Sequence, residues 1–278
     1  FSSFLSTTTA IENFRIKDQH KKGRLLLLDQ LNHDNRKHTD IMTDLESMID
    51  VDYVVPNIKV YTLLSEPSDP KYSEQWALKK VKALESWGYT KGDESIVIAV
   101  TDTGVDWKHE DLAKQIWLNT DEIPNNGIDD DNNGYIDDTR GWDFFSNDNN
   151  PDDETSNRNP GHGTHCAGII GAMGDNDIGV TGIAPIATIM PIRFLGADGS
   201  GDLMGATKAI DYAVDNNVNI ISASWGAAVA RQQMKPVLEA IARAKEKGIY
   251  FIAAAANNGN SNDLKEIYPA NAGLDNVI

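Results

Sequence analysis

The sequence has a single cysteine, Cys166, and therefore cannot form an internal disulfide framework. No apolar run approaches the roughly eighteen residues of a membrane-spanning helix. Positive charge is also scarce, since 25 Lys and Arg stand against 42 Asp and Glu, for a formal net charge of −17. No window forms a basic patch, which argues against a nucleic-acid partner. The acidic balance suits a secreted protein, or one whose carboxylates hold calcium.

Two short motifs carry the chemistry. Residues 97–104, Val-Ile-Ala-Val-Thr-Asp-Thr-Gly, predict a buried strand with Asp102 at its carboxyl end, where open α/β sheets place functional groups. Residues 161–168, Gly-His-Gly-Thr-His-Cys-Ala-Gly, put His162 on a glycine-flanked turn that enters a helix of small residues. An Asp ahead of a His, each at the end of an element, is the order of the first two members of an Asp-His-Ser triad. No Gly-Thr-Ser-Met-Ala-type segment follows, so the third member is missing from this sequence.

Strand and helix patterns alternate after residue 94. The expected strands are residues 95–101, 188–195, 219–224 and 249–255, and the expected helices are residues 162–173, 201–216 and 231–247. Such alternation predicts an α/β fold with a doubly wound parallel sheet, right-handed crossovers and helices on both faces. Asp102, Ser224 and Asn257 then all end or follow strands, at one edge of the sheet.

The first 64 residues form a different kind of segment. We expect a small α+β unit with a strand at residues 24–28, a helix at 40–48 and a second strand at 51–55. The proline-containing stretch 65–70 then predicts an exposed linker. The length allows two unequal domains, which we place at residues 1–64 and 65–278. The chain begins at Phe1 without Met or a signal sequence, and we expect both of its ends to be cut.

From about Asp52 to the end, the chain resembles the subtilisin-like serine proteases, or subtilases. Besides the two motifs, three segments resemble the family in the family's order: residues 179–185, 196–201 and 254–257. The resemblance implies a serine endopeptidase that cleaves polypeptide substrates, with its serine several tens of residues beyond Ile278. It also implies that residues 1–64 are the tail of an inhibitory, folding-assisting propeptide; an ordinary N-terminal extension is the alternative. A secreted or cell-envelope monomer is expected.

The resemblance assigns roles to several residues. Asp102 would orient the imidazole of His162, which takes a proton from the serine and returns it to the leaving amine. Asn257 would donate to the oxyanion of the tetrahedral intermediate. The segment Gly199, Ser200 and Gly201 resembles the edge that pairs with substrate backbone, and Ser224, Trp225 and Gly226 resemble the wall of the specificity pocket. Subtilases more often carry Gly where Ala256 stands, and Cys166 is expected to be a buried small hydrophobe.

Two calcium sites are expected. Residues 129–137 follow the D-x-D-x-N-G pattern of calcium loops, and the donors are Asp129, Asp131, Asn133, Tyr135 and Asp137. Arg140 stands where the twelfth-place Glu belongs, so Asp137 or Asp138 must complete the shell; a solvated acidic loop is the alternative. The resemblance adds a second site at Asp111, with Gln75 and the loop around Asn176, Ile178 and Val180 as partners.

Other readings of the motifs remain open on the residues alone. Asp102-Thr103-Gly104 is also an aspartic-protease signature, but two such loops are needed and one is present. Gly199-Ser200-Gly201 hints at a dinucleotide site, yet Ile220 and Ile221 stand where its carboxylate belongs. His162 and His165 have zinc-ligand spacing without an obvious third ligand. A catalytically inactive subtilase fragment or calcium-binding pseudoenzyme is the remaining alternative, because this sequence holds no matching nucleophile.

Overall fold

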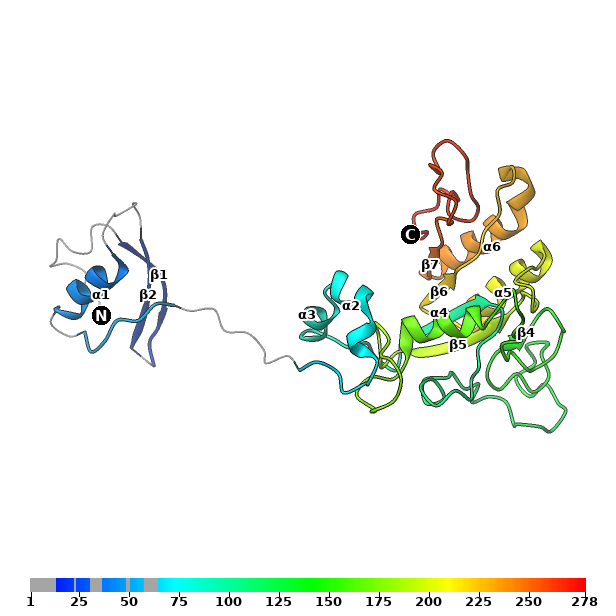
Figure 1. Cartoon of the computed structure of the whole chain (residues 1–278), viewed down its shortest axis with the longest axis horizontal. Coiled ribbons are helices and arrows are strands. Elements are labelled where there is room, and N and C mark those ends of the chain that lie inside the picture. Colours follow the sequence, from blue (N-terminus) through cyan, green and yellow to red (C-terminus); the bar gives the residue numbers. More distant parts are fainter. Residues whose placement is uncertain (1–13, 23, 31–36, 49–50, 58–64) are drawn as a thin grey trace. The chain divides into compact units, whose positions relative to one another are not determined.

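The computed structural model describes residues 14–22, 24–30, 37–48, 51–57 and 65–278, and it divides the chain into two compact units, Phe1–Leu63 and Leu64–Ile278 (Figure 1). Each unit is described by itself. Among the described residues, no helix has the length and apolar character needed to cross a membrane.

The described residues of the first unit form two antiparallel strands and a helix. Strand β1 (Phe14–His20) pairs with β2 (Leu25–Gln30), and α1 (His38–Glu46) buries Ile41 and Leu45 on one face. The helix and β2 confirm two expected elements with shifted ends, whereas β1 was not expected.

The strand expected at residues 51–55 is wrong. Residues 51–57 have no regular structure, and the amide of Val54 donates to the carboxylate of Glu46 at 2.9 Å. A side chain thus takes the hydrogen bond that a neighbouring strand would have accepted.

The second unit is built on a five-stranded parallel sheet in the order β4-β5-β3-β6-β7. Its strands are β3 (Val97–Asp102), β4 (Trp142–Asp143), β5 (Thr188–Arg193), β6 (Ile220–Ala223) and β7 (Tyr250–Ala253). Four of these confirm the expected strands, each shortened at one or both ends. Because β3 is central, Asp102 lies between the carboxyl ends of β5 and β6.

Helices cover both faces of this sheet, which confirms the doubly wound α/β fold. One buried cluster joins the sheet to α5 (Leu203–Asp215) and α6 (Lys235–Glu246), and a separate cluster joins its other face to α4 (His162–Gly171). The helix expected from Arg231 begins instead with a 3₁₀ turn, Arg231–Met234, and becomes α-helical where a proline occupies the first turn. Gly248 follows α6 at φ +76°, the left-handed conformation in which glycine commonly ends a helix.

Residues 65–95 are more structured than expected. They contain a 3₁₀ helix, Tyr72–Glu74, and two short helices, α2 (Trp76–Lys80) and α3 (Ala83–Trp87). The exposed-linker prediction is wrong at Asp69, which is 4% exposed and accepts from the amide of Asp175 at 2.8 Å.

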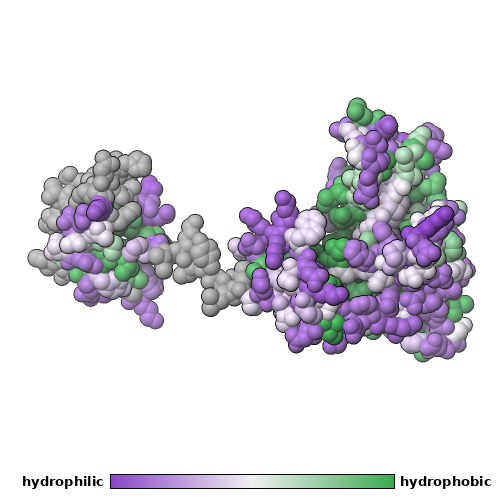
Figure 2. Space-filling view, viewed as in Figure 1, coloured by the Kyte–Doolittle hydropathy of each residue, from purple (hydrophilic) through white to green (hydrophobic). Residues whose placement is uncertain are grey.

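The surface divides by polarity. Hydrophilic residues cover much of the visible face of the second unit, and hydrophobic residues gather toward the middle of that face (Figure 2). Ile169 of α4 and Ile252 of β7 are 54% and 38% exposed.

Candidate active site

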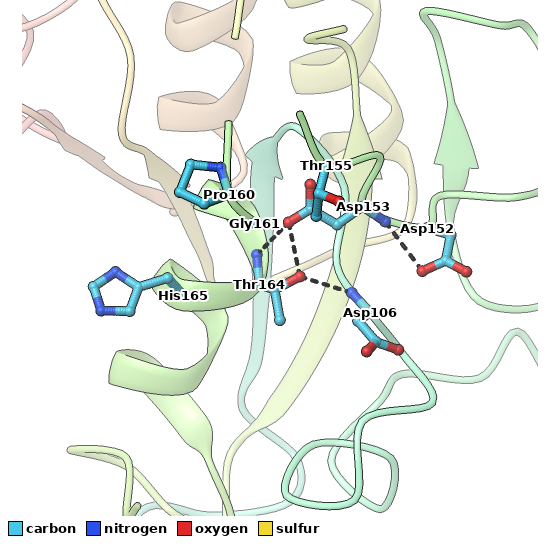
Figure 3. A pocket seen from close by; sticks show the side chains of 8 residues that line it. All are labelled: Asp106, Asp152, Asp153, Thr155, Pro160, Gly161, Thr164 and His165. Atoms are coloured by element: carbon cyan, nitrogen blue, oxygen red, sulfur yellow. Dashed lines mark hydrogen bonds between the residues drawn. The ribbon is translucent and has the colours of Figure 1, made fainter. Parts of the chain in front are cut away.

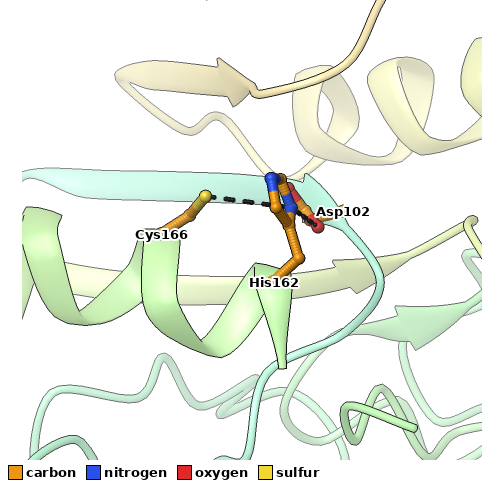
Figure 4. A group of neighbouring side chains, drawn as sticks. All are labelled: Asp102, His162 and Cys166. Atoms are coloured by element: carbon orange, nitrogen blue, oxygen red, sulfur yellow. Dashed lines mark hydrogen bonds and ion pairs between the residues drawn. The ribbon is translucent and has the colours of Figure 1, made fainter. Parts of the chain in front are cut away.

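Asp102 and His162 meet at the carboxyl end of β3. Asp102 is the last residue of that strand and His162 is the first residue of α4. His162 Nδ1 lies 2.7 Å from Asp102 Oδ1 (Figure 4). The 59 residues between them, 103–161, therefore leave the end of β3 and return to it.

The Asp102 carboxyl is fully buried. Its Oδ1 also accepts from the amide of Thr103 at 2.7 Å, while Oδ2 has no hydrogen-bond partner in the described part of the chain. Burial raises the pKa of Asp102, and the hydrogen bonds from His162 and Thr103 oppose that rise. A carboxylate held in this way fixes the ring of His162 and the tautomer that carries hydrogen on Nδ1.

The other side of the His162 ring is open. Its side chain is 48% exposed, against 1% for that of Asp102. With Nδ1 engaged, Nε2 is the nitrogen left to take a proton from a reacting group. The arrangement can therefore perform general base chemistry at the sheet edge.

Cys166 lies one helical turn after His162. Its Sγ is 4.0 Å from His162 Nδ1, so Asp102, His162 and Cys166 form one group (Figure 4). The thiol is half-buried rather than buried as expected, since it packs against the core cluster under α4 while its sulfur reaches His162. Burial raises the pKa of this thiol, which disfavours a reactive thiolate. His165 is exposed and lies outside the group.

Asn257 lies in an exposed bend after β7. Asn257 follows β7, which runs parallel to β3, so Asn257 and Asp102 both lie at the carboxyl ends of the strands. The preceding residue, Ala256, has φ +74°, a left-handed conformation that favours glycine. The frequent family glycine at this place thus has a backbone reason.

The two expected substrate segments differ in exposure. Gly199, Ser200 and Gly201 are exposed, in a turn in which the amide of Gly196 donates to the carbonyl of Ser200 at 2.8 Å. Trp225 is half-buried, packs between Phe194 and Phe251, and donates from Nε1 to Thr101 Oγ1 at 3.1 Å. Its bulk is therefore directed into the core.

Two cavities flank these residues. One of about 330 Å³ adjoins the exposed turn and is lined by Phe144, Phe145, Phe194, Ser200, Gly201, Asp202 and Gly205. The other, of about 530 Å³, lies beside the start of α4 (Figure 3) and is lined by Asp106, Asp152, Asp153, Thr155, Pro160, Gly161, Thr164 and His165. The three phenylalanines and Asp153 escaped sequence reasoning, because only the tertiary fold brings them to the site.

The acidic loop converges on a buried glutamate that sequence reasoning missed. Carboxylate oxygens of Glu122, Asp129 and Asp131 lie within 4.8 Å of one another. Glu122 is 4% exposed, and its Oε1 accepts from the amides of Asp130 and Asp131 at 2.8 and 3.2 Å. Such an all-oxygen donor set fits a hard cation such as calcium.

The other expected ligands of this loop make different contacts. The amide Nδ2 of Asn133 donates to Asp131 and to Asp138, whereas Asp137 accepts from the amides of Asn126 and Gly127, and the Tyr135 ring packs against Trp142. Asp138 is fully buried and accepts from the hydroxyl of Tyr212 at 2.5 Å. Burial raises the pKa of Asp138 to about 6.

The expected partners of Asp111 lie close to it in the fold. Asp111 is 2% exposed and accepts from Asn176 Nδ2 at 2.8 Å and from the amide of Val180 at 2.9 Å. The side-chain amide of Gln75 donates to the carbonyl of Thr181, the residue after Val180, and accepts from its backbone amide. The structure thus brings Asp111, Gln75 and the 176–180 loop into one neighbourhood.

Comparison with known proteins agrees with this geometry. The model of the Subtilase family matches residues 93–278. Thermitase of Thermoactinomyces vulgaris is 35% identical over 207 residues, covering 74% of this chain and 63% of that protein. The thermophilic serine proteinase of Bacillus sp. (strain AK1) is 32% identical over 229 residues, covering 82% and 48%. Subtilisin-like protease 1 of Plasmodium berghei (strain Anka) is 36% identical over 186 residues, covering 66% and 30%.

An α/β sheet whose central strand ends at Asp102, in contact with His162 at the start of α4, together with these matches defines a subtilisin-like serine peptidase fold. The chain belongs to the subtilase family. It spans less than two thirds of the length of each of these three relatives.

Proposed function

We propose that these residues belong to a serine endopeptidase that hydrolyses polypeptides through an Asp-His-Ser triad whose serine lies outside residues 1–278. The observation that carries the proposal is the 2.7 Å contact of His162 Nδ1 with buried Asp102, on a ring that is otherwise open. A serine presented to Nε2 would lose its proton to His162 as it attacks the scissile carbonyl. Asp102 would stabilise the resulting imidazolium, and His162 would then protonate the leaving amine.

The other roles complete this proposal. Asn257 would donate to the oxyanion, the turn Gly199–Gly201 would pair with substrate backbone, and Ser224 to Gly226 would line the specificity pocket. Residues 1–64 would be part of a propeptide that inhibits the enzyme, and the mature protein would be a monomer in the cell envelope or outside the cell. Both the acidic loop and the Asp111 neighbourhood would hold calcium, which would neutralise buried carboxylates and fix the loops around the site.

A fluorophosphonate probe tests the function directly. The longer protein that we propose should be labelled at one serine, and His162→Ala should abolish that labelling because the serine is no longer activated. The 278-residue chain should stay unlabelled. Labelling of a serine within residues 1–278 contradicts the assignment, and a folded longer protein that fails to label is a pseudoenzyme.

Mutant kinetics supply the second arm. Asp102→Ala and His162→Ala should each remove most of the turnover, and the double variant should be little worse than His162→Ala, because triad members act as a unit. Multiplicative losses would mean that the two residues do not share one mechanism.

A further inference from the structure

The helix that begins with His162 has no cap of its own. An α-helix leaves its first four amides without intrahelical partners, and Gly161, at the cap position, has no side chain. Other segments supply the acceptors. The amide of His162 donates to Asn159 Oδ1 at 2.7 Å, that of Gly163 to Thr103 Oγ1 at 3.0 Å, and that of Thr164 to Asp153 Oδ2 at 2.9 Å.

Asp153 is one of these three acceptors and accepts hydrogen bonds from the other two. Its Oδ2 accepts from both the amide and the hydroxyl of Thr164, at 2.9 and 2.7 Å (Figure 3). Its Oδ1 accepts from Thr103 Oγ1 at 2.9 Å and from Asn159 Nδ2 at 3.4 Å. One carboxylate therefore ties together the end of β3, the turn before α4 and the first turn of α4.

The bonded residues are the neighbours of the Asp–His pair. Thr103 directly follows Asp102, and Asn159 holds the amide of His162. A negative charge at a helix amino terminus also interacts favourably with the helix dipole. The hydrogen bonds of Asp153 in the described part of the chain go to Thr103, Asn159 and Thr164 and not to the His162 ring, so any effect on that ring passes through the backbone segments that it joins.

We propose that Asp153 is a positioning residue that fixes α4 against the end of β3 and so holds His162 on Asp102. This inference rests on the proposed function for its catalytic meaning, but the geometry can be tested without proteolysis. If Asp153 only anchored its loop, its substitution would lower the stability of the fold and leave the tautomer of the His162 imidazole unchanged.

The direct test reads the tautomer of His162 in the ¹⁵N-histidine-labelled 278-residue chain, by correlation of the ring nitrogens with the carbon-bound ring protons. The signal is assigned by its loss in His162→Ala. Wild type should carry hydrogen on Nδ1, and Asp153→Asn should shift the ring toward a mixture of tautomers. Asp152→Asn is the control, because it makes the same charge change at the adjacent residue.

A second pair of variants guards against simple misfolding. Thr103→Val removes the hydroxyl that links Asp153 to Gly163 and should reproduce the tautomer shift, whereas Thr103→Ser keeps the hydroxyl and should not. An unchanged Nδ1–H tautomer in both Asp153→Asn and Thr103→Val overturns the proposal, as does a wild-type ring without hydrogen on Nδ1.

Kinetics of the longer protein separate the two proposals. Asp153→Asn should lower kcat on the order of tenfold to a hundredfold with little change in KM, because misplacement of a catalytic group acts on the chemical step. Absence of proteolysis in wild type sinks the proposed function while the tautomer result still decides the positioning. An active Asp153→Asn variant with the wild-type kcat sinks the positioning role alone.

Discussion

The backbone amide of Gly163 donates to the hydroxyl of Thr103 across 3.0 Å. Thr103 follows Asp102 and Gly163 follows His162, so the Asp–His pair is joined a second time through its neighbours. A Cβ built on Gly163 would overlap the carbonyl oxygen of Gly104 and lie 3.0 Å from the Cβ of Asp102. The approach of the helix to the strand end therefore requires glycine at this position.

Gly163→Ala should consequently destabilise the fold by at least about 1–3 kcal/mol, because the backbone of Gly104 cannot yield as a side chain would. Gly168→Ala, on the same helix, is the matched control, since its Cβ would meet nothing within 4 Å. That control should stabilise by up to about 1 kcal/mol through helix propensity. Urea denaturation measures both changes, and equal midpoints for Gly163→Ala and wild type would contradict the packing argument.

The raised pKa of Asp102 predicts a pH-dependent stability. The folded chain binds this proton more tightly than the unfolded chain does, so the free energy of unfolding falls as pH rises from about 4 through the folded-state value. The cost of ionising this buried carboxyl is therefore greater at neutral pH than in acid. Asp102→Asn places an amide where Oδ2 lacks a partner and removes this cost.

Asp102→Asn should therefore be more stable than wild type at pH 7, with a difference that shrinks toward pH 3.5. Denaturant unfolding across that range measures it. A stability difference that is constant with pH, or that grows toward acid, would show that the Asp102 carboxyl is not held in this way.

Calcium should stabilise the second unit through the acidic loop. At millimolar calcium and a micromolar Kd, binding adds roughly 4 kcal/mol to the free energy of unfolding. Asp131→Ala and Glu122→Gln should each remove most of the calcium-dependent rise in melting temperature, because both carboxylates belong to the same cluster. Asp152→Ala, outside that cluster, should keep the full response. If a chelator does not change the melting temperature of wild type, residues 129–137 are a solvated acidic loop and not a calcium site.

Ala256 offers a test of backbone strain. An L-residue at φ +74° is strained by roughly 1–2 kcal/mol relative to glycine, and the greater unfolded-state entropy of glycine offsets part of the gain. Ala256→Gly should therefore raise the free energy of unfolding by about 1 kcal/mol or less. Ala255→Gly, where φ is not positive, should lower it. A lower melting temperature for Ala256→Gly would mean that the side chain contributes packing that outweighs the strain.

Local sequence predicted the elements of the sheet well. The β-branched run before Asp102 and the glycine-flanked turn at His162 each specify an element and its end, because buried strands and helix starts have local signatures. The predictions were wrong where a hydrogen-bond partner from another segment decides the local structure. Residues 51–55 resemble a strand, but the amide of Val54 donates to the carboxylate of Glu46 instead of to a neighbouring strand. Asp69 resembles part of a linker, but its carboxylate accepts a hydrogen bond from the amide of Asp175, which holds it in the fold.

The sequence by itself determined the family and the parallel α/β architecture, and it singled out Asp102 and His162 as a pair, since each of these rests on short ordered motifs. Only the tertiary structure revealed that Asp153 caps the helix of His162 and that Glu122 joins Asp129 and Asp131. Both residues lie in long irregular segments whose course no periodicity predicts. Their contacts form because buried amides and carboxylates must find hydrogen-bond partners, and those partners come from segments that only the folded chain brings together.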